Sequence, residues 1–328
     1  MKKTSVRSSL TLLLTAMIWG VAFVAQSVGM DYVEPFTFSF TRCILGGLVL
    51  IPCIALMDRQ KTRQEREQIK ANRRTLLDGE PRRSELPDGN GAACVRHERR
   101  CRTMVGGVCC GIALCVASNL QQIGIQYTTV GKAGFITALY IVLVPVIEIF
   151  LGKKSGIRTW ISVVIAVAGL YLLCITDGFS IGTGDILILL CALAFSVHIL
   201  IIDYFSPKVD GVRMSCIQFF VCGILSGIAM LIFETPSVSA VIQAWLPIGY
   251  AGILSCGVAY TLQIIGQKGT DPTVASLILS LESVVSVLSG WLILHQSLSR
   301  KELLGCVLMF LAIILVQLPQ KETEPQAE

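Results

Sequence analysis

Long apolar segments follow one another along the 328 residues of this chain. A bilayer core requires about 20 apolar residues per helix. Continuous apolar runs favour helices, because the strands of a membrane barrel would alternate polar and apolar residues. The sequence therefore predicts an all-α integral membrane protein with ten transmembrane helices, at Leu10–Met30, Pro35–Met57, Met104–Ile125, Ala133–Leu151, Thr159–Thr176, Asp185–Phe205, Arg213–Phe233, Val241–Ile265, Thr273–Leu294 and Glu302–Leu318.

The second five spans echo the first five. A shift of 141 residues places residues 111–129 on residues 252–270 with 7 identities in 19 positions, and a shift of 176 places Arg42 on Gln218. A duplicated unit of five spans inserts in opposite orientations, so the halves form inverted repeats, as in many secondary transporters. We expect a first five-helix repeat at 8–176, a second at 184–319 and a tail at 320–328.

Charge is concentrated between the second and third spans, where residues 58–103 hold 13 basic and 8 acidic residues. If the N-terminus is cytoplasmic, 23 Lys and Arg lie inside and three outside, and Arg42 alone lies within a span. This bias predicts a cell-membrane protein with both termini in the cytoplasm. It also explains the net charge of +5 without nucleic acid. We expect residues 59–70 to form a short charged helix and the rest of the 58–103 loop to be disordered.

The 13 cysteines are mostly single residues within spans and suggest no disulfide framework. Cys94, His97 and Cys101 resemble a metal site, but their spacing matches no paired zinc pattern and a fourth ligand is lacking. We therefore expect neither a metal nor a cofactor.

One motif tests the possibility of an enzyme. Gly182-Thr-Gly-Asp185 matches the pattern of intramembrane aspartyl proteases, whose chemistry needs two aspartates in one site. The next aspartate of that span, Asp203, lies about 27 Å away along the same helix. Asp185 is better explained as a helix cap. Since P-loop and zinc-protease motifs are also missing from the sequence, we expect no enzymatic activity.

Motifs in order along the chain resemble the drug/metabolite transporter superfamily, in its ten-span EamA branch. They include Trp19-Gly20-x2-Phe23, Ser39-Phe-Thr-Arg42, Gly134-Phe-Ile-Thr-Ala-Leu-Tyr140 with Pro145, Gly184-Asp185, Ala192-x2-Phe195-Ser-x-His198 and Ser280-Leu-Glu282. This sequence departs from the family in having Ser283 after Glu282, where proline is common, and a longer second loop. The resemblance implies a central cavity lined by both repeats and, in most members, export of amino acids or other small metabolites.

Ionisable residues within spans are costly and mark functional candidates. Arg42 can bind a substrate carboxylate through two hydrogen bonds or pair with backbone carbonyls. Glu282, near the middle of the ninth span, can take a coupling proton or hydrogen-bond a neighbouring helix. His198 can relay protons or simply pack. Glu148 is more consistent with a structural role near the cytoplasmic end.

Polar and aromatic residues of the spans form a second group of candidates. On cavity-facing surfaces they would hydrogen-bond or stack a solute, and otherwise they would bond neighbouring helices. A shift of 141 relates the pair Asn119 and Gln122 to the pair Tyr260 and Gln263. The whole group comprises Trp19, Asn119, Gln122, Tyr140, Gln218, Tyr260 and Gln263.

These features together predict a secondary transporter that works by alternating access and exports an amino acid or related metabolite. The expected partners are a small-molecule substrate, the lipid bilayer and a coupling proton. The sequence leaves open whether the protein forms a homodimer. Import of a small organic solute is the alternative direction. A receptor or scaffold that binds without transport is the alternative class.

Overall fold

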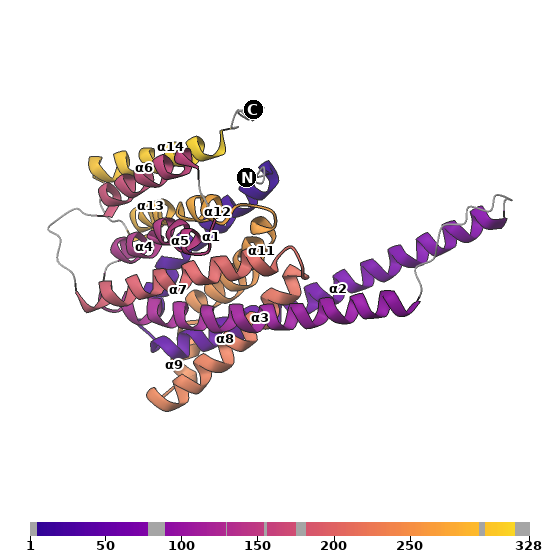
Figure 1. The fold of residues 1–328 in the computed structure, drawn as a ribbon. Helices are drawn as coiled ribbons and strands as arrows, with labels where there is room; N and C mark the ends of the chain where they lie inside the picture. Colours follow the sequence, from indigo (N-terminus) through magenta and orange to yellow (C-terminus); the bar gives the residue numbers. More distant parts are fainter. Residues whose placement is uncertain are drawn as a thin grey trace, which may run out of the picture.

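The structure is a computed structural model that describes residues 5–77, 89–128, 130–153, 156–174, 182–294 and 299–318. The predicted tail at 320–328 lies outside these residues. Within them all regular structure is helical (Figure 1). The elements are α1 (Val6–Gly29), α2 (Pro35–Leu77), α3 (Gly89–Ile125), α4 (Val130–Ala138), α5 (Tyr140–Phe150), α6 (Ile157–Cys174), α7 (Thr183–Phe205), α8 (Gly211–Phe233), α9 (Val238–Gln243), α10 (Trp245–Gly249), the π-helix η1 (Tyr250–Tyr260), α11 (Thr261–Gln267), α12 (Pro272–Leu279), α13 (Glu282–Leu294) and α14 (Arg300–Gln317).

The helices confirm the predicted fold class. In the described residues eight apolar helical segments are long enough to cross a membrane, and two shorter ones lie within α6 and α14. These ten segments correspond in order to the ten predicted spans. Leucine, isoleucine and valine cover their outer surfaces, as expected where a helix faces lipid rather than water.

Two spans are interrupted at corresponding places in the two halves. The fourth span breaks at Leu139, between α4 and α5, and the ninth breaks at Ser280 and Leu281, between α12 and α13. The 141-residue shift that relates the third and eighth spans also places Ala138, the end of α4, on Leu279, the end of α12. Interrupted spans at matching positions of inverted repeats are typical of transporter binding sites.

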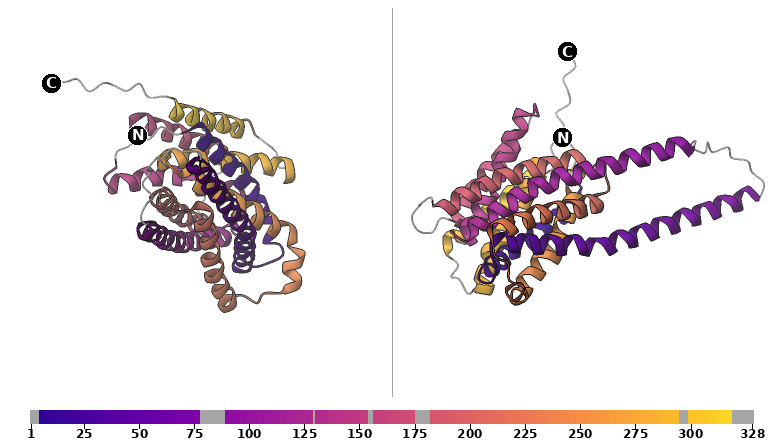
Figure 2. Two further views of the ribbon diagram at one scale, coloured as in Figure 1. Left: turned by 90° about the vertical axis from the view of Figure 1, so that its right-hand side faces the viewer. Right: turned by 90° about the horizontal axis from the view of Figure 1, so that it is seen from below.

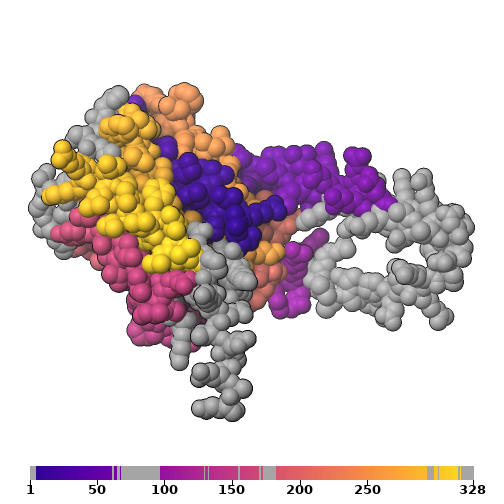
Figure 3. All heavy atoms as spheres, turned by 90° about the horizontal axis from the view of Figure 1, so that it is seen from above, coloured from indigo at the N-terminus to yellow at the C-terminus, as the bar shows by residue number. Residues whose placement is uncertain are grey.

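The 58–103 segment differs from our expectation. α2 continues to Leu77 and α3 begins at Gly89, so the two helices extend together beyond the other helices as an arm (Figures 1 and 3). Residues 59–77 contain no glycine or proline and many strong helix formers, and Arg63 pairs with Glu67 one turn later at 3.0 Å. Disorder was therefore the wrong prediction for residues 71–77 and 89–103; residues 78–88 lie outside the description.

Close helix packing builds the centre of the bundle. Gly107 and Gly111 of α3 face Ile217 and Val221 of α8, where an added Cβ would come within 2.6 Å of each of those two side chains. Such small residues let helix backbones approach in lipid, where dispersion replaces the hydrophobic effect as the main attraction. α6 and α14 lie side by side at the edge of the body (Figure 1, and Figure 2 in two further views).

α2 and α8 are joined at both ends. At one end the Glu234 carboxylate accepts hydrogen bonds from Phe36 N and from Thr37 N and Oγ1, each 2.7 Å long. These donors are at the N-terminus of α2, which favours a negative charge. At the other end Arg213 of α8 donates to both carboxylate oxygens of Asp58 at 2.6 Å. The two helices therefore hold a fixed register along their length.

Candidate functional site

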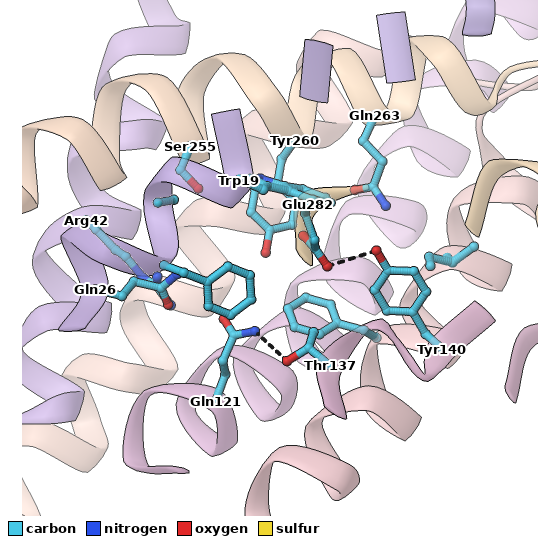
Figure 4. Close-up of a pocket in the computed structure, with 14 residues that line it drawn as sticks. Trp19, Gln26, Arg42, Gln121, Thr137, Tyr140, Ser255, Tyr260, Gln263 and Glu282 are labelled. Carbon is cyan, nitrogen blue, oxygen red and sulfur yellow. Dashed lines mark hydrogen bonds between the residues drawn. The ribbon is translucent and has the colours of Figure 1, made fainter. Parts of the chain in front are cut away.

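A central cavity lies between both halves of the bundle, next to the interrupted spans (Figure 4). It has about 460 Å³ of empty space, counting its open mouth. The lining comes from α1, α2, α3, α4, α5, α7, η1, α11 and α13. Its residues are Trp19, Ala22, Phe23, Gln26, Arg42, Gln121, Thr137, Tyr140, Phe195, Ile199, Ser255, Tyr260, Gln263 and Glu282.

The two helix breaks meet at one hydrogen bond. Tyr140 is the first residue of α5 and Glu282 the first of α13, and the Tyr140 hydroxyl donates to Glu282 Oε1 at 2.8 Å. Glu282 is 4% exposed, and among the described residues no basic group lies within ion-pair distance of it. The cavity thus contains a buried carboxyl group on a helix end that the neighbouring half of the molecule holds in place.

Arg42 contributes a buried positive charge on another side of the cavity. It is 5% exposed and its guanidinium carbon lies 5.4 Å from the centroid of the Phe38 ring. In the described part of the chain no carboxylate lies within ion-pair distance, and Arg42 Nε has no hydrogen-bond partner. Figure 4 shows Arg42 beside Gln26, whereas Tyr140 lies on the opposite side of the cavity. A buried guanidinium with an unused donor is suited to an anionic ligand.

Aromatic side chains form a wall between these charged groups. The Trp19 and Tyr260 rings lie 4.6 Å apart between centroids with an interplanar angle of 57°. Phe219 supports Tyr260 from behind, edge on, at 5.5 Å. The two tilted rings present an apolar, rigid surface against which the carbon part of a solute can pack.

Four buried polar atoms of the lining have no hydrogen-bond partner among the described residues. They are Trp19 Nε1, Gln26 Oε1, Arg42 Nε and Gln263 Oε1. Buried polar groups in proteins are nearly always satisfied, and each exception calls for an explanation such as a ligand or water. Two donors and two acceptors in one cavity suit a polar solute with groups of both kinds.

The cavity lies in a chain whose sequence matches a known family. The model of the EamA-like transporter family matches residues 7–77, 92–175 and 182–318. The chain belongs to the EamA-like transporter family. It is therefore a multi-pass membrane transporter and not an enzyme, and its two matched halves agree with two inverted repeats.

Relatives of this transporter extend over nearly the whole chain. An uncharacterized transporter of Archaeoglobus fulgidus is 28% identical over 312 residues, covering 95% of this chain and 86% of its own length. The uncharacterized transporter YoaV of Bacillus subtilis is 21% identical over 316 residues, covering 94% of this chain and 96% of its own length. A crystal structure with 19% identity and a TM-score of 0.69 covers 95% of this chain and 96% of its own, which supports the fold alone.

In this EamA-like transporter six of the ten candidate residues line the cavity: Trp19, Arg42, Tyr140, Tyr260, Gln263 and Glu282. The other four lie outside the lining and join helices instead. Asn119 donates to Ser226 Oγ at 2.9 Å, and Gln122 donates to the Gln26 carbonyl at 3.2 Å. His198 Nε2 and Gln218 Oε1 lie 3.1 Å apart.

Four polar lining residues were missed from the sequence: Gln26, Gln121, Thr137 and Ser255. Gln121 Nε2 donates to Thr137 Oγ1 at 3.2 Å and so joins α3 to α4. A residue next to Gln122 turns about 100° away around the helix, so only a correct choice of face would have identified Gln121. Thr137 precedes the break in the fourth span, which the sequence did not predict.

Asp185 has the capping role that the sequence indicated. It accepts from Gly182 N at 2.9 Å and from Thr128 Oγ1 at 2.8 Å, and so fixes the start of α7. The Cys94, His97 and Cys101 motif falls on the arm, and the Cys94 side chain lies outside the described residues.

Proposed function

We propose that this protein is a secondary transporter that exports an amino acid or a closely related zwitterion by alternating access. The observation that carries the proposal is a cavity with Arg42, whose Nε has no hydrogen-bond partner among the described residues, and the Glu282 carboxyl group in its lining. A zwitterion presents a carboxylate and an ammonium group, and the lining offers one cationic and one acidic side chain to receive them.

Each group of the proposed substrate has a counterpart in the lining. Arg42 binds the carboxylate through charge-assisted hydrogen bonds. Glu282 holds either the ammonium group or a proton, so that substrate and proton exclude each other at this residue. Trp19 and Tyr260 pack against the carbon skeleton. This competition would couple outward movement of the solute to inward movement of protons.

Orientation follows from charge. With 23 Lys and Arg on one side of the ten spans and three on the other, we propose that both termini and the α2–α3 arm are cytoplasmic. The cell membrane is then the site of action. The units 8–176 and 184–319 are the proposed repeats, which face each other across the cavity.

Flux from proteoliposomes tests this function. Purified protein is reconstituted and loaded with radiolabelled amino acids, nucleosides or sugars, one class at a time, with and without an imposed pH gradient. We expect efflux of an amino acid that accelerates when the outside is acidic. Efflux without that acceleration would contradict proton coupling, and accumulation driven by the same gradient would show an importer. Saturable binding without flux would show a receptor.

A further inference from the structure

A second polar cluster lies between the same two interrupted spans, away from the cavity. Glu148 of α5 is 2% exposed, and its Oε2 accepts from Thr273 Oγ1 of α12 at 2.7 Å. Lys153, just after α5, lies 3.1 Å from Glu148 Oε1 and 3.2 Å from Asp203 Oδ2 of α7. These four residues, the Glu148 cluster, join the fourth, sixth and ninth spans.

The cluster lies beyond the cavity, toward one end of the bundle. On α7, Asp203 follows the cavity residue Ile199 by one helical turn, about 6 Å. On α5, Glu148 follows the cavity residue Tyr140 by two turns, about 12 Å. None of the four residues belongs to the lining. The cluster therefore lies between the cavity and the end of the bundle where α5 and α7 stop and α12 begins.

Lys153 is the one cation of the cluster and lies between two carboxyl groups. Partial burial lowers the pKa of the Lys153 ammonium, but Glu148 and Asp203 outweigh this effect, so that its pKa lies above the ordinary value. Lys153 is 49% exposed, whereas Glu148 is buried. Water can therefore reach the cation and compete for it, while the carboxyl group is left without a partner if the helices part. The pair therefore favours the conformation in which these helices are together, and it is lost in a conformation in which they part.

We propose that the Glu148 cluster is the latch of one gate: it holds the fourth, sixth and ninth spans together, and its release opens the cavity toward that end. In the orientation proposed above, this is the cytoplasmic gate. The Tyr140–Glu282 hydrogen bond also joins the fourth and ninth spans, but beside the cavity. The fourth and ninth spans are thus connected once at the site and once at the gate.

The latch can be tested without any substrate. Ala22 lines the cavity, and residues 10–30 contain no native cysteine, so Ala22→Cys supplies a reporter that peptide mass spectrometry resolves. A membrane-impermeant methanethiosulfonate is added to right-side-out or inside-out vesicles, and the modification rate is measured from each face. Thr273→Val, which keeps the size of the side chain but removes the hydrogen bond, is combined with the reporter.

We expect Thr273→Val to raise the rate from the Glu148 end about fivefold, the effect of one lost hydrogen bond on a two-state equilibrium. The rate from the opposite end should not rise. Lys153→Gln should act in the same direction. Thr270→Val is the matched control, because the Thr270 hydroxyl donates to the Gly266 carbonyl on its own segment and should leave both rates unchanged.

Three results would overturn the latch. These are equal rates in the Thr273→Val and Thr270→Val proteins, a rise from both faces, which indicates general loosening, and no labelling from the Glu148 end in any variant. Melting temperature and gel-filtration profile verify that each variant is folded. The inference uses the alternating access of the proposed function, but the labelling contains no amino acid. A negative flux panel with a positive labelling result would therefore reject the proposed substrate and keep the latch.

Discussion

Replacing Arg42 with glutamine tests the proposed carboxylate site most directly. Arg42 is buried with an unpaired Nε, so its interaction with a bound carboxylate takes place out of water. Hydrogen bonds to charged groups contribute about 1.5–3 kcal/mol, which corresponds to a loss of about 10- to 150-fold in affinity. Arg42→Lys keeps the charge without the forked geometry and should lose less.

The assay compares two ligands by isothermal titration calorimetry: an amino acid that the flux experiment identifies as a substrate, and its α-amide, which lacks the carboxylate charge. We expect Arg42→Gln to lower the affinity for the amino acid by this factor of about 10- to 150-fold and to leave the affinity for the amide nearly unchanged. Gln218→Leu, at the repeat-equivalent position outside the lining, serves as the control and should spare both ligands. An equal loss for acid and amide would refute the reasoning, because Arg42 would then act on the shape of the cavity and not on the carboxylate.

Three further predictions concern coupling and packing. The Glu282→Gln side chain cannot take up or release a proton. Efflux should therefore lose its response to an imposed pH gradient, while efflux down a substrate gradient continues. An unchanged response to the pH gradient would exclude Glu282 from coupling. Glu234→Gln removes the negative charge at the start of α2; it should cost about 1–3 kcal/mol of stability and so lower the melting temperature in detergent. Gly20→Ala should cost about 1–3 kcal/mol because its Cβ would lie 2.4 Å from Val285 Cβ. Gly131→Ala, whose Cβ would meet no heavy atom within 4 Å beyond its neighbours and its own helix backbone, should not destabilise the protein in the same thermal assay.

Hydropathy predicted the spans because the bilayer imposes length and composition on each helix separately. It did not predict the breaks in the fourth and ninth spans, since neither Leu139 nor Ser280 is a glycine or proline. Pro145, the residue a sequence argument would choose, lies inside α5. In the ninth span the Ser280 hydroxyl donates to the Leu277 carbonyl at 2.8 Å, and the Ser283 hydroxyl donates to the Ser280 carbonyl at 2.7 Å. Such bonds compete with the helix, so closely spaced serines were the available signal.

Placement in the cavity depends on helix rotation, which a single sequence constrains weakly. Arg42 and Glu282 were identifiable because a charge within a span needs a reason. Uncharged polar residues can form hydrogen bonds at any contact between helices as well as in a cavity. By residue type alone, Asn119 and Gln218 therefore cannot be told from cavity residues. Only the structure shows that each bonds a neighbouring helix.

The two repeats share a fold but not a site. The 141-residue shift that relates the helices places Asn119 on Tyr260 and Gln122 on Gln263, yet only the second pair lines the cavity. The shift of 176 likewise places Arg42, which lines the cavity, on Gln218, which bonds His198 outside it. A symmetric cavity would offer the same groups on both sides. The proposed zwitterion has opposite charges at its two ends, so its recognition would require different groups on the two sides of the cavity.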